Sequence, residues 1–571
     1  MNPVVQAQLK AFSNSNPSSK FSESDFFEVF SIYSISNGLL TDDVDPFKAH
    51  LQGDEFGLDG ITIKVQGELC TNSDDVAEAL TVGKNHHVEF GLFQSKTSEK
   101  ADYGNMSKFF DAAFEFFSGC VLNPSDQLQD RIAAKDALYA SALKRNPSLD
   151  LFYVTTGTGE MSDQIKKLVD ATTSRFVDLS IFDSVRIKLI GAKDLQTGYR
   201  SATNSNSERV EILKPITLPE HPNVQQAFLG YVDAKELVKL ATVMSGDDEN
   251  PRINRAVFFD NVRDFNDKSE INHGILEDLK SGGRQSFIFK NNGVTVVAKS
   301  VNRQGDFFDL EDYQIVNGCQ TSNILFQAQE HAKGVHVPFR LIVSDDPEFV
   351  STVIIGTNRQ NEVKEDQFWA LTPFMKDLEE FCREQSDDQR IFIERRENQY
   401  RTEAVERTRV FKPSELVKSV AAMFMYHPHR AARDYRGIKK EFSNVLFQSK
   451  HSVKLYHAAA FTSYKLDFAI RNRRVDRAWG IYKFYVLYMI GRQYAGEGKV
   501  FDQKRKMQDQ IASEIISFAE DEDRLVNEFS KCAEVLDRLI SEAKLETREK
   551  IRDHIRSERV SKEFAKSLDL N

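Results

Sequence analysis

The chain has 571 residues, 40% of them hydrophobic and 28% charged, and it is too long for one hydrophobic core, so we expect several domains. Its formal net charge of −11 at first disfavours a nucleic-acid partner. No apolar run approaches the ~20 residues that cross a bilayer, and five widely spaced cysteines without a CxxC pair argue against a disulfide framework or a zinc module. We therefore expect a cytoplasmic protein with reduced thiols, no secretory signal and no membrane association.

The amino-terminal third alternates between predicted helices and strands. Residues 1–20 are rich in Ser, Asn and Gln and predict a loose tail, after which Ser24 is expected to cap a helix that ends at Asn37-Gly38. A strand is predicted where Ile61, Ile63 and Val65 alternate with polar residues, since this period buries one face. Further helices are expected at 105–118, 126–144 and 162–177, strands at 86–96, 149–157 and 185–190, and a surface excursion at 71–85. This βαβ alternation predicts an α/β sheet.

The second half of the chain begins with a linker and has a different pattern of predicted helices and strands. Residues 201–207 (SATNSNS) form the clearest linker. Beyond it we predict helices at 234–245 and 269–280, a hairpin with an Asn-Gly turn at 286–298, a strand, glycine turn and helix at 313–329, and strands at 339–343 and 352–355. The pattern is mostly helical from Pro413 onward, and the amphipathic stretch 503–567 predicts a homodimer. The expected multi-domain α/β organisation is a tail (1–20), an amino-terminal domain (21–200), a central α/β region (209–440) and a mostly α-helical carboxyl-terminal region (441–571).

One segment has a net positive charge although the whole chain has a net negative charge. Residues 390–440 contain 13 lysines and arginines and 6 acidic residues, interleaved with Tyr400, Phe411, Tyr426 and Tyr435. Such a segment can follow a phosphate backbone and stack on bases, or it can simply form the solvated face of helices.

Three polar residues suggest a hydrolytic site. Gln94 and Lys96 lie two residues apart and so share one face of a strand, which neighbouring residues could not do. Asp59, on the preceding strand, can face both. A carboxylate, an amide oxygen and a lysine around one point suit Mg²⁺ (or Mn²⁺) and a water that attacks phosphate, because Mg²⁺ prefers oxygen ligands and is held by few carboxylates. The alternative is a strand-edge turn at Asp59-Gly60 and an ordinary surface lysine.

The pattern GxDG, followed by a strand that ends in QxK, resembles the restriction-endonuclease-like PD-(D/E)xK superfamily and its Mrr-like branch, over roughly Phe21 to Tyr199. The resemblance implies a mixed sheet flanked by helices and a metal-dependent endonuclease, a phosphodiester hydrolase. It implies that Asp59, the Gln94 side-chain oxygen and the Ser95 carbonyl hold the metal, that Lys96 assists the attacking water, and that Glu28 is an additional acid. Glutamine in place of the usual middle acid leaves a decayed site as an alternative.

Residues from about 209 to 440 resemble the AIPR (abortive infection phage resistance) family. The motifs that carry the likeness are FFDNVRDF with Asn272 after it, FKNNGVTVV, QIVNGCQT, GTNRQNEV and ERRENQY. Their amides, hydroxyls and arginines predict a nucleic-acid or nucleotide pocket formed by Arg263, Asn291, Asn292, Asn317, Gln320, Thr321, Asn358, Arg395 and Arg396. The alternative for each residue is that turns need Asn and Gly.

Together the two resemblances imply a bacterial phage-defence protein that cleaves DNA (or RNA) with Mg²⁺, regulated by its AIPR region and associated with restriction or defence partner proteins. The main alternative is a non-catalytic nucleic-acid-binding or regulatory subunit on a degenerate nuclease fold. A third is a purely structural subunit of a restriction complex.

Overall fold

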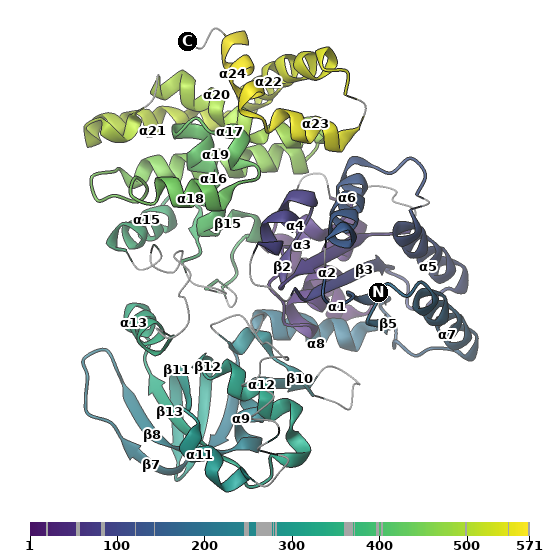
Figure 1. Ribbon diagram of the computed structural model, residues 1–571, viewed down its shortest axis with the longest axis vertical. Helices are drawn as coiled ribbons and strands as arrows, with labels where there is room; N and C mark the ends of the chain where they lie inside the picture. Colours follow the sequence, from purple (N-terminus) through teal and green to yellow (C-terminus); the bar gives the residue numbers. More distant parts are fainter. Residues whose placement is uncertain are drawn as a thin grey trace.

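The computed structural model has three regions, coloured purple to blue, teal, and green to yellow along the chain (Figure 1). It describes the chain except for residues 19–20, 53–56, 82–85, 120, 142, 245–250, 259–276, 278, 280–282, 359–368, 370–371, 396–398, 401–402, 497–498, 546 and 569–571. The predicted mixed α/β class, with a mostly helical carboxyl-terminal region, is confirmed. Within the described ranges, no helix combines the length and the apolar character that a membrane crossing requires.

The amino-terminal region is a five-stranded sheet with helices on both faces. The strand order is β2-β1-β3-β4-β5, with β1 antiparallel to β2 and β3, and with β3, β4 and β5 parallel. One face packs on α5, α6 and α7, and the other on α1, α2 and α8. The elements are α1 (Pro3–Ser15), α2 (Glu23–Tyr33), η1 (Ser34–Leu39), α3 (Pro46–Ala49), β1 (Gly60–Val65), β2 (Glu68–Leu69), α4 (Ser73–Leu80), β3 (Val88–Ser95), α5 (Tyr103–Ser118), α6 (Asp126–Ala140), β4 (Ser148–Val154), α7 (Asp163–Asp178), β5 (Ser184–Ile190) and α8 (Ala192–Thr203).

Several predictions for this region were wrong. Residues 3–15 of the expected tail form α1, because Val5, Leu9 and Phe12 recur at helical spacing and are buried. Helix α2 is capped by Ser22, not by Ser24, in a capping box with Asp25.

Two further corrections concern the sheet and its connections. The expected surface excursion at 71–85 contains α4, whose buried Val76 and Ala79 belong to the core. Strand β1 is buried on both faces, since Thr62 and Lys64 are covered as well. The predicted linker is shorter than expected, because residues 201–203 end α8 and Ser207 begins β6.

The central region is a six-stranded sheet of order β6-β12-β11-β13-β8-β7. Helices α9 and α12 cover one face of this sheet, and the core lies between them and that face. Helix α13 covers the opposite face, where Ile354 is buried. The elements are β6 (Ser207–Glu211), β7 (Leu213–Thr217), β8 (Gln226–Asp233), α9 (Ala234–Ala241), β9 (Thr242–Met244), β10 (Pro251–Ile253), η2 (Arg255–Val257), η4 (Gly283–Ser286), α11 (Phe287–Lys290), β11 (Val294–Gln304), β12 (Phe307–Asn317), α12 (Cys319–Gln327), η5 (Gln329–His331), β13 (His336–Val343) and α13 (Pro347–Asn358).

Three predicted elements differ from those observed here. The hairpin expected at 286–298 does not form, because residues 287–290 are the helical turn α11 and β11 pairs instead with β12 and β13. The strand expected at 352–355 lies inside helix α13. Helix α9 ends at Ala241 rather than at 245, and β9 follows it. The helix predicted at 269–280 lies almost wholly outside the described residues.

The carboxyl-terminal region is a helical body with one continuous core from Phe374 to Phe564. The predicted boundary at 440–441 therefore falls inside this core. The amphipathic faces of α21 to α24 are buried within it, so the pattern that predicted a homodimer is explained inside one chain. The elements are α15 (Pro373–Arg383), β14 (Phe392–Ile393), η6 (Arg407–Arg409), β15 (Val410–Phe411), α16 (Pro413–Phe424), α17 (Pro428–Ala431), α18 (Tyr435–Phe442), α19 (Val453–Arg471), η7 (Arg477–Tyr482), α20 (Lys483–Ala495), η8 (Val500–Asp502), α21 (Arg505–Glu520), α22 (Glu522–Glu542), α23 (Arg548–Ile555) and α24 (Glu558–Ser567).

Ion pairs connect the amino-terminal region to both other regions. Arg255 of the central region contacts Asp42 at 2.7 Å and Glu89 at 3.1 Å, and Lys64 joins the same two carboxylates. Helices of the carboxyl-terminal region supply Lys412–Asp43, Glu415–Lys48, Lys418–Glu78, Arg548–Asp126, Arg552–Asp130 and Arg556–Asp74. The amino-terminal sheet is thus held by charged contacts from two sides.

Candidate functional site

Asp59 and Gln94 lie at the same end of adjacent antiparallel strands. Gly60 of β1 pairs with Phe93 of β3, so one further step of this register sets Asp59 opposite Gln94. The Asp59 N–H donates to the Phe93 carbonyl at 2.8 Å, which extends the ladder to this residue. Directly opposite residues of an antiparallel pair project to the same face. The two side chains therefore continue the face that packs on α5.

The glycines around Asp59 have specific roles. Gly57 has φ of 93°, a conformation that favours glycine, and a Cβ there would lie 3.4 Å from the Gln94 Nε2 atom. A Cβ at Gly60 would lie 2.5 Å from the Ile32 Cδ1 atom of α2, so α2 packs directly on the start of β1. Glu28 is one helical turn before Ile32 on the same face of α2. The GxDG sequence thus allows α2 and the Gln94 side chain to approach Asp59 closely.

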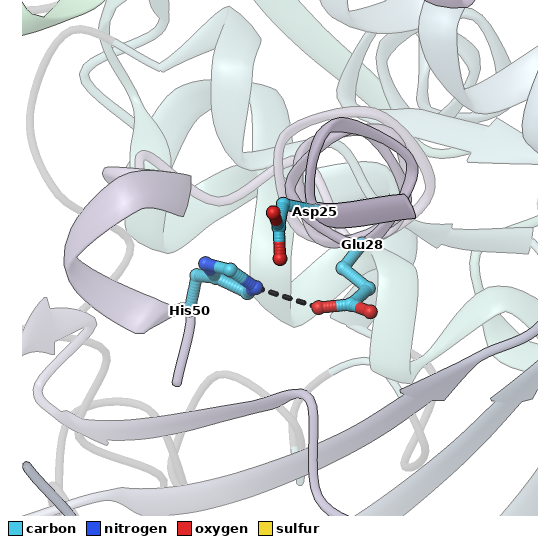
Figure 2. A group of neighbouring side chains, drawn as sticks. All are labelled: Asp25, Glu28 and His50. Atoms are coloured by element: carbon cyan, nitrogen blue, oxygen red, sulfur yellow. Dashed lines mark hydrogen bonds and ion pairs between the residues drawn. The ribbon is translucent and has the colours of Figure 1, made fainter. Parts of the chain in front are cut away.

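Glu28 belongs to a second polar cluster, with Asp25 and His50 (Figure 2). One ligand atom from each residue lies within 4.8 Å of the others. The fully buried His50 ring points its Nε2 atom at the Glu28 carboxylate, 2.7 Å away (Figure 2). Asp25 accepts from the Ser22 N–H and hydroxyl. His50 therefore orients Glu28, while Asp25 completes the capping box of α2.

The electrostatics of Asp59 reflect its neighbours. Burial, and next to it the charge of Glu28, raise the pKa of Asp59 from its ordinary value of 3.8 to about 7. The Ser95 N–H, which donates to the carboxylate at 2.6 Å, and the Lys96 ammonium act in the opposite direction. Glu28 and Lys96 therefore both interact with Asp59, from α2 and from the end of β3. A perturbed carboxyl pKa of this kind is typical of functional sites, although structural networks also produce it.

The oxygen atoms at this position fit a hard divalent cation. Gln94 is 3% exposed, and its Oε1 atom accepts no hydrogen bond from any described residue. An unsatisfied buried acceptor costs about 1–3 kcal/mol, so a cation near it would recover that free energy. Asp59, Gln94 and Glu28 offer carboxylate and amide oxygens, the donors that Mg²⁺ and Mn²⁺ prefer.

The structure brings some of the predicted central residues together, at turns. Asn291 accepts from the Gly293 N–H at 2.8 Å and donates to the Thr321 hydroxyl at 3.0 Å, while Asn317 donates to the Thr357 carbonyl at 3.3 Å. Asn292 and Gln320 are exposed. The first two contacts hold the turn before β11 against the first turn of α12, and the third holds the end of β12 against α13, so Asn291, Asn317 and Thr321 have structural roles. Three predicted groups lie outside the described residues: Arg263, Arg396 and the Asn358 side chain. The same holds for most of the motifs FFDNVRDF and GTNRQNEV.

Several cations and rings of the basic segment at 390–440 have structural partners in the described residues. The Arg395 side chain is 5% exposed and pairs with Glu379 and Glu348, so it is not a free phosphate clamp. Arg409 pairs with Glu406, and Arg430 with Asp434 and Glu441. Tyr400, Phe411 and Tyr435 are buried, and Tyr426 packs against the core. Stacking on bases is therefore wrong for these three buried rings, which serve packing.

The fold and the site define a multi-domain α/β protein with an oxygen-rich acidic site at the end of its amino-terminal sheet. Residues 258–554, just over half of the chain, match the model of the AIPR protein family. The chain therefore belongs to the AIPR family. The match begins later than the predicted region and extends through most of the helical body. Comparison with curated proteins and with solved structures found no match.

Reasoning from the sequence missed His50 and Asp25 as neighbours of Glu28. His50 is 22 residues from Glu28, and no spacing rule connects a helix to the segment after α3. Asp25 carried a local signal, since Ser22 followed three residues later by an acid is a capping-box pattern.

Proposed function

We propose that this AIPR protein acts in phage defence through an amino-terminal domain that is a Mg²⁺-dependent endonuclease of the restriction-endonuclease-like type, cutting DNA. Family membership supports the defence role. The mixed sheet with helices on both faces supports the nuclease fold. RNA is the alternative substrate, and the AIPR region would bind nucleic acid or a nucleotide and restrain cleavage.

The observation that carries the proposal is the pairing of Asp59 with Gln94. The carboxylate stands opposite an amide oxygen that is buried without a donor among the described residues. A strand-edge turn alone needs no such oxygen pair. Burial and, next to it, the charge of Glu28 raise the pKa of Asp59, and a cation bound beside the carboxylate would oppose both effects.

In the proposed mechanism the residues of the chain bind and orient. A bound Mg²⁺ ion supplies Lewis acidity toward the phosphate and lowers the pKa of a water molecule. Asp59 and the Gln94 amide oxygen would hold the cation, with Glu28 adjacent and oriented by His50. The Lys96 ammonium, two residues beyond Gln94, offsets charge that develops on the phosphate.

The experiment compares wild type with Asp59→Asn, Lys96→Ala and the matched control Lys100→Ala, which removes an exposed ammonium four residues from Lys96. Each protein is incubated with plasmid DNA or RNA in Mg²⁺, Mn²⁺ or EDTA. We expect cleavage by wild type and Lys100→Ala only with metal, and a loss of about 100-fold or more in the other two variants. Equal cleavage by Asp59→Asn would end the proposal.

The rival function is nucleic-acid binding without catalysis, on the same fold. The neutral Gln94 favours it, because one negative charge fewer weakens cation binding. The rival predicts salt-dependent binding of nucleic acid and no cleavage in any metal. A homodimer and defence-system partner proteins stay predictions, which light scattering and co-purification would test.

A further inference from the structure

We infer that a cavity between the amino-terminal and central regions binds a nucleotide. The cavity has a volume of about 1080 Å³ and is lined by residues of α8, the segment 204–207, α9 and the loop before β13. In Figure 1, α8 lies between the amino-terminal sheet and the region of α9 and β10. Ligand pockets occur preferentially at domain boundaries and have volumes of about 300–1,000 Å³, so this cavity is slightly larger than that range.

Cations from three separate elements reach this cavity. Arg200 comes from α8, Lys235 from α9, and Lys333 from the loop before β13. Across the described part of the chain, none of these three side chains makes a hydrogen bond or an ion pair. A fourth, Lys239, is already committed to Glu208 and to the Arg209 carbonyl. Exposed lysines are common on surfaces, but convergence of three unpaired cations on one concavity creates a site for an anion.

The remaining lining suits a base and a sugar. Asn204, Ser205 and Gln329 supply amide and hydroxyl groups, and Val238 and Ala332 supply apolar surface. Residues of the predicted linker are therefore part of the cavity wall. Mixed apolar walls with a few convergent polar groups are typical of small-molecule sites.

A nucleotide fits better than a nucleic-acid strand. A strand needs a basic track along its backbone, whereas here the acidic residues Glu208 and Asp233 also line the cavity. Phosphates would meet Arg200, Lys235 and Lys333. Asn254 lines the same cavity, and the next residue, Arg255, is tied to Asp42 and Glu89 of the amino-terminal region. A bound nucleotide would thus contact the segment that joins the two regions.

The test is isothermal titration calorimetry of the full-length protein with ATP, GTP, adenosine, inorganic phosphate and a short single-stranded oligonucleotide. The variants are Lys235→Ala/Lys333→Ala and Arg200→Gln, and the control is Lys299→Ala, an exposed lysine of β11 that does not line the cavity. We expect ATP or GTP to bind, adenosine to bind far more weakly, and the double variant to lose about tenfold or more in affinity, with Lys299→Ala unchanged. Thermal unfolding checks that each variant is folded.

This inference deepens the proposed nucleotide binding by placing it in a cavity between the amino-terminal and central regions, and it does not depend on the nuclease. Repeating the titration with Asp59→Asn separates the two, because that variant should keep nucleotide affinity even if cleavage is lost or never existed. The inference is overturned if neither nucleotide binds at millimolar concentration, if the double variant binds as well as wild type, or if adenosine equals ATP. Binding of the oligonucleotide alone would assign the cavity to nucleic acid and also overturn it.

Discussion

The backbone N–H of Ser95 donates a hydrogen bond of 2.6 Å to the Asp59 carboxylate, across the ends of two antiparallel strands. This bond favours the ionised carboxylate, whereas burial and Glu28 favour the protonated form and prevail. Asp59 is therefore an acid whose charge state changes near neutral pH in the metal-free protein. The first two predictions follow from this balance.

Asp59→Asn should stabilise the metal-free protein at high pH. The folded-state pKa of Asp59 is raised to about 7, so its stabilising contribution is present below its unfolded value of 3.8 and is lost as pH rises through about 7. Asparagine resembles the protonated carboxyl group and avoids that loss. In EDTA we expect Asp59→Asn to be more stable by about 1–3 kcal/mol at pH 8 and equal to wild type near pH 4, measured by urea unfolding. A pH-independent difference would contradict this assignment.

Glu28→Gln should lower the pH at which Mg²⁺ binding reaches half its maximum. Removing the Glu28 charge removes one cause of the raised pKa of Asp59, while burial, the larger cause, remains. The midpoint should fall from about 7 but stay above 3.8, as measured by calorimetric titration of Mg²⁺ across pH. Asp25→Asn is the control on the same helix and should leave the midpoint in place.

His50→Leu should weaken Mg²⁺ binding because Glu28 loses its partner, and His50→Gln should restore part of it through an amide donor.

The candidate site was more predictable than the central sheet, for a physical reason. Asp59 and Gln94 follow from alternation along two strands, a local property. The run Thr352 to Ile355 looks like a strand by β-branching, but Asp346 accepts from the N–H groups of Glu348 and Phe349, and Ile354 packs on the sheet from a helix. Tertiary packing overrides propensity there.

The failed hairpin has a similar cause. The Asn-Gly signal at 292–293 does mark a turn, with Gly293 at φ of 87°. A hairpin also needs a partner strand directly before the turn, and β11 finds its partners in β12 and β13 instead. Which strand pairs with which depends on contacts distant in sequence, and a single sequence does not display them. The His50–Glu28 contact was missed for the same reason.

Arg255→Met should destabilise the protein strongly. Arg255 and Lys64 balance Asp42 and Glu89, whose side chains are 2% and 13% exposed. Burial would raise the pKa of Glu89, but Lys64 and Arg255 outweigh it and hold that pKa well below its usual range. Removing Arg255 leaves Lys64 alone against two buried carboxylates, so one buried negative charge is no longer balanced, which costs about 3–5 kcal/mol. Thermal unfolding measures the loss. Arg209→Met, at a pair with Asp309 that is exposed on both sides, is the control and should cost under about 1 kcal/mol.

Gly318→Ala tests whether the glycine of the QIVNGCQT motif is required by the fold. Gly318 has φ of 105°, and a Cβ there would lie 2.5 Å from the Val294 Cγ2 atom, so alanine meets both backbone strain and a clash. We expect a loss of about 2–4 kcal/mol in the free energy of unfolding. Gly305→Ala is the matched control, since its φ of 68° is also left-handed but its Cβ would meet nothing within 4 Å. That variant should lose only about 1–2 kcal/mol of the free energy of unfolding. Equal losses at Gly318 and Gly305 would show that the contact with Val294 adds nothing to the backbone strain, which would then alone explain the motif glycine.

Gly356→Ala lies in helix α13 with open space around it, and its free energy of unfolding should instead increase by about 1 kcal/mol.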